Sequence, residues 1–169
     1  DSSIANKLYS IYDEQGNLIE KGYWRVKSGS KLYNFSFVDS QGKDILLSKQ
    51  IAQYIKELSQ RFYGFGQISS VMDSHGNSPT KESTHPSGNC VDLGLRAYMP
   101  NIGKIADICS ALIKHQATKC IYFEYMDNGY KPIFDKIMLE LKNRKINTGK
   151  VAFICFPKKI SWNILIKIR

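Results

Sequence analysis

The stretch Ser83-Thr84-His85-Pro86-Ser87-Gly88-Asn89-Cys90-Val91-Asp92 reads S-x-H-x-x-G-x-C-x-D and leads directly into an apolar run. It places two potential metal ligands, His85 and Asp92, in a turn that enters a strand predicted at residues 90–95. A neutral imidazole and a carboxylate are both good ligands for first-row metals. Gly88 would let the chain fold back so that both side chains face one point. The stretch therefore predicts a metal site beside this strand.

Apolar residues recur at helical spacing in three segments, one before this strand and two after it. They are Ile51, Tyr54, Ile55, Leu58 and Phe62; Ile102, Ile105, Cys109, Leu112 and Ile113; and Ile133, Phe134, Ile137, Met138 and Leu141. Ser48 can cap the first helix, and Pro132 falls in the first turn of the third. All three apolar faces are predicted to pack into a core.

Further strands are predicted at residues 67–72, 120–125, 151–156 and 162–168. The first forty-odd residues predict two hairpins, with D-x-Q-G turns at 13–17 and 39–43, the second turn following a strand at 33–38. The order of elements predicts an α+β fold, in which an antiparallel or mixed sheet carries about three helices and follows the N-terminal β-hairpins. We expect one globular domain over 1–169, with a hairpin region at 1–44 and a core at 45–169.

The ten-residue motif resembles the first metal-binding segment of the zinc D-alanyl-D-alanine carboxypeptidases and L,D-endopeptidases that trim bacterial peptidoglycan. The pattern of that family is S-x-H-x-x-G-x-A-x-D. It is matched here by Ser83, His85, Gly88 and Asp92, with Cys90 where a small residue is usual. The preceding helix and short strand also follow the family's order, so the resemblance covers about residues 45–95. It implies a peptidase core in which His85 and Asp92 bind zinc and Ser83 contacts the substrate.

The same family takes its third ligand from a histidine on a late strand, usually with an acidic residue just before it as general base. Residues 161–169 contain neither a histidine nor a carboxylate. His75, in the polar loop at 73–82, could supply the missing ligand, although an exposed loop histidine is the commoner outcome. His115 follows the second helix, where a cationic side chain would favour the helix dipole.

Glu124 is a carboxylate in an otherwise apolar strand. If it faces the open side of the sheet near His85, its pKa could be raised enough for it to act as general base on a metal-bound water. The alternative is an outward-facing strand residue paired with a lysine. Strand alternation alone favours that alternative.

The four cysteines, Cys90, Cys109, Cys120 and Cys155, have no C-x-x-C spacing and lie in apolar surroundings. Each is therefore expected to be a small buried hydrophobic residue. Cys90 has a second interpretation because it lies inside the motif. A Cys90 nucleophile served by His85 or His75 would make the protein a thiol peptidase.

The formal net charge is +9, from 24 basic and 15 acidic residues, with basic clusters at 142–145 and 158–159. Such a surface attracts polyanions, including nucleic acid, anionic lipid and the anionic polymers of a cell wall; the alternative is a solvated basic face that maintains solubility. No aromatic-interleaved basic motif accompanies the charge, which argues against nucleic acid. No apolar run approaches the roughly 18 residues of a membrane span.

These features favour a secreted or periplasmic bacterial hydrolase, a zinc metallopeptidase that acts on peptidoglycan or binds another anionic cell-wall polymer. It could be one domain of a larger secreted assembly. The alternative is a degenerate, non-catalytic member of the family that binds cell wall or a protein partner. In either case His85 and Asp92 are expected to converge within about 4 Å of each other or of a common metal.

Overall fold

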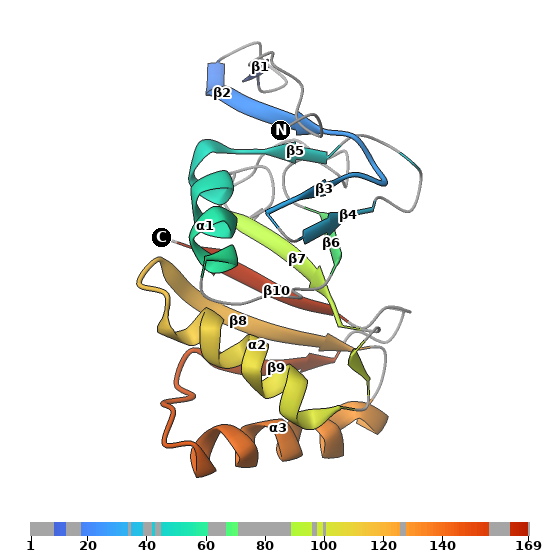
Figure 1. Cartoon of the computed structure of the whole chain (residues 1–169), viewed down its shortest axis with the longest axis vertical. Coiled ribbons are helices and arrows are strands. Elements are labelled where there is room, and N and C mark those ends of the chain that lie inside the picture. Colours follow the sequence, from blue (N-terminus) through green and yellow to red (C-terminus); the bar gives the residue numbers. More distant parts are fainter. Residues whose placement is uncertain are drawn as a thin grey trace. The chain divides into compact units, whose positions relative to one another are not determined.

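The computed structural model describes residues 9–12, 18–33, 35–38, 42, 45–60, 67–70, 89–95, 98–99, 101–125, 128–155 and 163–168 (Figure 1). The fold is α+β, as predicted, with three α-helices and a mixed sheet among these residues. The chain divides into two compact units, Asp1–Asp92 and Leu93–Arg169. The division falls inside strand β7 (Cys90–Gly94).

Among the described residues, the first unit holds six complete strands. They are β1 (Tyr9–Tyr12), β2 (Leu18–Val26), β3 (Lys31–Leu32), β4 (Phe35–Phe37), β5 (Ile45–Leu47) and β6 (Gln67–Ser70). One sheet has the order β1-β2-β5, and β3-β4-β6-β7 follow one another in the second. β1 and β2 are antiparallel, while the predicted turn at 13–17 between them lies outside the described residues.

The strand predicted at 33–38 is the shorter β4, and its pairing was not foreseen. β4 pairs antiparallel with β3 and parallel with β6, whereas β5, the strand that follows residues 39–43, pairs with β2. The described strands on either side of 39–43 therefore belong to different sheets and do not form a hairpin with each other. The short β3–β4 connection includes Tyr33 at φ 50°, a left-handed conformation that glycine normally adopts.

Helix α1 (Lys49–Ser59) confirms the first helical prediction. Its N-cap is Ser48, whose Oγ accepts a hydrogen bond from the Ile51 amide at 3.1 Å. Four of the five predicted apolar residues are buried: Ile51, Tyr54, Ile55 and Leu58. Phe62 lies outside the described residues. The helix packs against β2, so its apolar face is covered as its sequence spacing requires.

The second unit alternates helices and strands. Its elements are α2 (Ile102–Lys114), β8 (Thr118–Tyr125), the 3₁₀ turn η2 (Asn128–Tyr130), α3 (Lys131–Asn143), β9 (Val151–Cys155) and β10 (Asn163–Ile168). The strands have the order β10-β8-β9, with β10 antiparallel and β9 parallel to β8. Because β8 and β9 are parallel, the connection through α3 must return the chain to the end at which β8 began.

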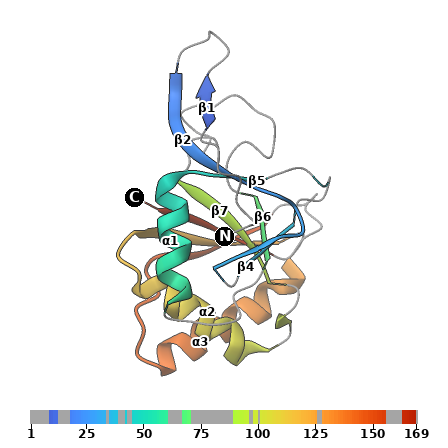
Figure 2. The ribbon, with the colours of Figure 1, turned by 45° about the horizontal axis from the view of Figure 1, so that its top comes forward.

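Helices α2 and α3 cover the same face of these strands, and both views show them side by side (Figures 1 and 2). Phe134 of α3 packs between Phe123 of β8 and Phe153 of β9, with ring centroids 5.3 Å apart in each pair. Helix α2 contacts both α3 and β8. The central residues of both predicted apolar faces are buried, namely Ile105, Cys109, Leu112, Phe134, Ile137 and Leu141. Ile102, Ile113, Ile133 and Met138 are half-buried.

The helices of the described residues are all too short or too polar to cross a membrane.

Candidate functional site

Asp92 lies in β7, where four consecutive residues are buried. Only 6% of Asp92 is exposed, and its Oδ1 atom is completely enclosed. A strand that is buried on both faces normally carries apolar side chains, as Val91 and Leu93 illustrate here. Burial of a carboxylate in such a strand costs free energy unless its charge is compensated. Packing in the core explains the burial of the apolar residues of β7 but does not explain the burial of Asp92.

The end of the motif is fixed to α1 within the first unit. Asn89 directly precedes β7, and its Oδ1 accepts a hydrogen bond from Gln50 Nε2 at 3.0 Å. Gln50 lies in the first turn of α1, beside the N-cap Ser48. This hydrogen bond ties the residue before β7 to the first turn of α1.

Three of the predicted site residues, His75, Ser83 and His85, lie outside the described residues. The expected convergence of His85 with Asp92 is therefore still a prediction. The same holds for the loop at 73–82, which was expected to present His75.

Glu124 lies near the end of β8 and is 6% exposed. This burial contradicts a solvent-facing strand residue, whereas the pairing of Glu124 with a lysine stays a prediction. Glu124 is opposite Asn163 of β10 and beside Ile154 of β9 in the strand register. Asn163 is the first residue of β10, the last strand, which itself contains no carboxylate. The buried carboxylate of Glu124 therefore lies opposite the start of β10.

His115 is buried at the C-cap of α2. Its Nδ1 accepts a hydrogen bond from the Ala117 amide at 3.0 Å, which ties the buried ring to the α2–β8 turn. A favourable effect of His115 on the helix dipole stays a prediction.

The described cysteines divide by burial. Cys90 and Cys109 are buried, as predicted, whereas Cys120 is half-buried. Burial raises the pKa of Cys109 to about 12, which keeps it in the unreactive thiol form. Cys90 is fully enclosed in β7. Its interpretation as a nucleophile served by His85 or His75 stays a prediction, because both histidines lie outside the described residues. The side chain of Cys155 lies outside the described residues.

The donor set nominated from the sequence, two imidazoles and a carboxylate, has the chemistry that zinc requires. The described residues contribute only Asp92 to it, and they contain no cluster of three or more His, Cys, Asp or Glu side chains able to hold a metal ion. The enclosed Oδ1 of Asp92 fits a ligand, because a carboxylate at a metal site is commonly shielded from water.

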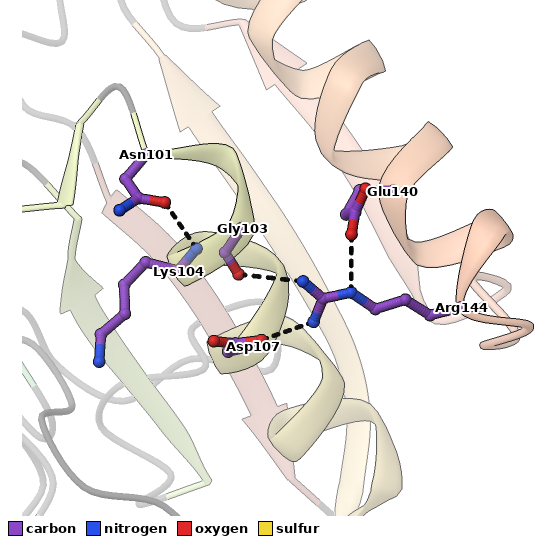
Figure 3. Close-up of polar contacts among 6 residues, drawn as sticks. All are labelled: Asn101, Gly103, Lys104, Asp107, Glu140 and Arg144. Carbon is purple, nitrogen blue, oxygen red and sulfur yellow. Dashed lines mark hydrogen bonds and ion pairs between the residues drawn. The ribbon is translucent and has the colours of Figure 1, made fainter.

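A polar cluster that the sequence did not reveal joins α2 to the end of α3 (Figure 3). Arg144 donates from Nη1 to Asp107 Oδ1 at 2.5 Å, from Nε to Glu140 Oε1 at 2.9 Å and from Nη2 to the Gly103 carbonyl at 3.3 Å. The hydrogen bonds to Asp107 and Glu140 raise the pKa of Arg144 above its usual range. In the sequence, Arg144 appears only as a member of the basic cluster at 142–145, and nothing there indicates its carboxylate partners.

Comparison with known proteins adds no relative: no family model matches this chain, and no curated protein does.

Proposed function

We propose that the protein is a zinc-dependent peptidase that hydrolyses peptide stems or cross-bridges of peptidoglycan. In this proposal His85 and Asp92 bind zinc, His75 is the third ligand and Ser83 contacts the substrate. A bound zinc ion would polarise the scissile carbonyl and lower the pKa of a water molecule. The single observation that carries the proposal is the burial of Asp92 at the end of the S-x-H-x-x-G-x-C-x-D motif.

The burial of Asp92 supports a ligand role for a physical reason. A buried carboxylate is stabilised by a cation or by hydrogen bonds, and a metal ion compensates its charge most completely. The Gln50–Asn89 hydrogen bond supports the same role, because ligands must be held on a rigid framework to bind a metal tightly.

Glu124 is the proposed general base. It is a buried carboxylate, and it stands opposite the first residue of the last strand. That strand is where the resembled family carries both its third ligand and its base. A glutamate on the neighbouring strand at this register supports a base supplied by β8 in place of β10.

The first experiment measures zinc in the purified protein by elemental analysis. We expect about one zinc per chain, because the donor set describes a single four-coordinate site. Asp92→Asn and His85→Ala should lose most of this zinc. Asp135→Asn is the matched control, because Asp135 is an exposed aspartate of α3. A folded, metal-free wild-type protein, or equal zinc in all variants, would contradict the zinc site.

The second experiment incubates the protein with purified sacculi and analyses the released muropeptides. Wild type should release new cleavage products, whereas Glu124→Gln should keep its zinc and lose activity by about 100-fold or more. Loss of zinc and activity together in Glu124→Gln would instead make Glu124 a ligand and contradict its role as base.

A second candidate function is a non-catalytic domain that binds cell wall or a protein partner. The observation that favours it is the composition of β10, which contains neither a histidine nor a carboxylate. Binding to sacculi without new muropeptides, together with unchanged behaviour of Glu124→Gln, would support this candidate and exclude the peptidase.

A further inference from the structure

The net charge of the protein is confined to one unit. Residues 1–92 contain ten basic and ten acidic residues, whereas residues 93–169 contain fourteen basic and five acidic residues, so the second unit carries the whole +9. A net charge that only maintained solubility would not need to be confined to one unit. The uneven distribution indicates that the positive surface of the second unit has a binding role.

Five lysines gather at one end of the second unit, which we call the basic end: Lys114, Lys119, Lys142, Lys145 and Lys150. The α2–β8 connection and the α3–β9 connection both lie there, since β8 and β9 are parallel and start at the same end. The two connections touch, because Lys150 Nζ reaches the Ile113 carbonyl at 3.5 Å and the Ile121 amide donates to the Lys150 carbonyl at 2.8 Å.

The chain segments of the basic end carry no acidic residue: none of the residues 113–119 or 141–150 is acidic. Two carboxylates of the adjoining helices, Asp107 and Glu140, both accept hydrogen bonds from Arg144. All five lysines except the half-buried Lys150 are exposed, so like charges face solvent together.

Lys145 adds an independent observation. Helix α3 ends in a Schellman motif, in which the Ile146 amide donates to the Leu141 carbonyl at 2.9 Å and the Lys145 amide to the Lys142 carbonyl at 2.8 Å. Lys145 therefore occupies the position that glycine normally takes, and its φ is 59°. A side chain at this position strains the backbone. Strain held at an exposed lysine points to a use for its charge.

Helix dipoles account for only part of the cluster. A lysine near the C-terminus of a helix is favourable, which explains Lys114 in α2 and Lys142 in α3. Lys119, Lys145 and Lys150 lie outside the helices, where this effect is weak. A ligand with several negative charges would stabilise all five.

The chemistry of the basic end selects the kind of polyanion. Its cations are lysines, which act as point charges, whereas the one arginine nearby is held in its own hydrogen bonds. Val38 and Leu139, the large hydrophobic side chains exposed among the described residues, do not belong to it. It therefore offers no aromatic platform for nucleic-acid bases and no apolar wedge for a bilayer.

We propose that the basic end binds a flexible phosphodiester polymer that carries its charge in its backbone, such as the poly(glycerol phosphate) chains of a cell envelope. The contacts are between lysine ammonium groups and successive phosphates. This binding does not depend on the proposed peptidase activity, because none of the five lysines belongs to the candidate metal site.

The test measures binding of the full chain to soluble poly(glycerol phosphate) over a range of salt concentrations. The triple variant Lys114→Gln, Lys119→Gln, Lys145→Gln is compared with Lys27→Gln, Lys49→Gln, Lys56→Gln, which removes three exposed lysines from the first unit. We expect the first variant to lose at least tenfold in affinity, and the logarithmic salt slope to fall by roughly 2. The second should stay within threefold of wild type.

Lys145→Gly separates binding from folding. It should weaken binding while leaving the protein at least as stable, because glycine suits the left-handed position. Single-stranded DNA and phosphatidylglycerol vesicles are the comparison ligands. Equal losses in both triple variants, no binding of the polymer, or binding of DNA or vesicles ten times tighter than the polymer would each overturn the proposal.

Discussion

Lys145 gives the clearest stability prediction for a single residue. Replacing it with glycine relieves the strain of φ 59°, although glycine also gains entropy in the unfolded chain. We expect Lys145→Gly to raise the free energy of unfolding by roughly 0.5–1 kcal/mol, measured by urea denaturation.

Lys142→Gly is the matched control for this substitution. Lys142 lies in the last turn of α3, in an ordinary helical position, where glycine destabilises by up to about 1 kcal/mol. Opposite signs for the two variants support the Schellman assignment. A loss of stability in both would mean that the Lys145 backbone is not strained.

The candidate site illustrates what single residues in a sequence can reveal. Asp92 could be nominated because its spacing from His85 repeats a known motif. The burial of Glu124 could not be predicted, because strand alternation assigns a residue to a face without saying whether that face is covered. The left-handed Lys145 gave no signal either, since glycine or asparagine normally marks this position.

At the scale of elements, Arg144 connects the end of α3 to α2 through two hydrogen bonds, to Asp107 and to the Gly103 carbonyl. Its third hydrogen bond goes to Glu140 within α3. We expect Arg144→Met to lower the free energy of unfolding by about 1 kcal/mol, because surface ion pairs contribute little individually but a network contributes more. The effect should shrink in 1 M salt, where the ion pairs are screened. Urea denaturation at low and high salt measures both quantities.

Lys136→Met is the control for this prediction. Lys136 is an exposed lysine of the same helix, and its loss should change stability by less than about 0.5 kcal/mol at either salt concentration. Equal effects of the two substitutions would show that Arg144 does not join the helices energetically.

The elements themselves were largely predictable, whereas their pairing was not. The periodic apolar residues correctly predicted α1, α2 and α3, and Ser48 and Pro132 correctly marked the starts of α1 and α3. Strand β8 begins two residues before its predicted start, at Thr118, because the polar Lys119 interrupts the apolar pattern. The pairing of β4 with β3 and β6 depends on contacts between distant residues, about which local patterns carry no information.

At the scale of the whole molecule, the proposed zinc ligands lie in the neutral first unit and the proposed polymer site lies in the basic second unit. Asp92 of the first unit is a proposed zinc ligand, and the basic end of the second is a proposed polymer site. The two are chemically independent: zinc binding depends on a buried carboxylate, whereas polymer binding depends on exposed lysines and weakens with salt.

The zinc proposal makes a thermodynamic prediction for the complete chain. A ligand that binds only the folded protein stabilises it by about 2.7 kcal/mol at 100 times its Kd. For a chain of this size, that gain raises Tm by roughly 5–10 °C. We therefore expect zinc to raise Tm by this amount, EDTA to reverse the rise, and Asp92→Asn to abolish it in differential scanning calorimetry. Asp135→Asn should respond like wild type, because Asp135 is exposed and pairs with Lys131. If zinc raised Tm equally in Asp92→Asn, the ion would be bound elsewhere on the protein, and Asp92 would not be a ligand.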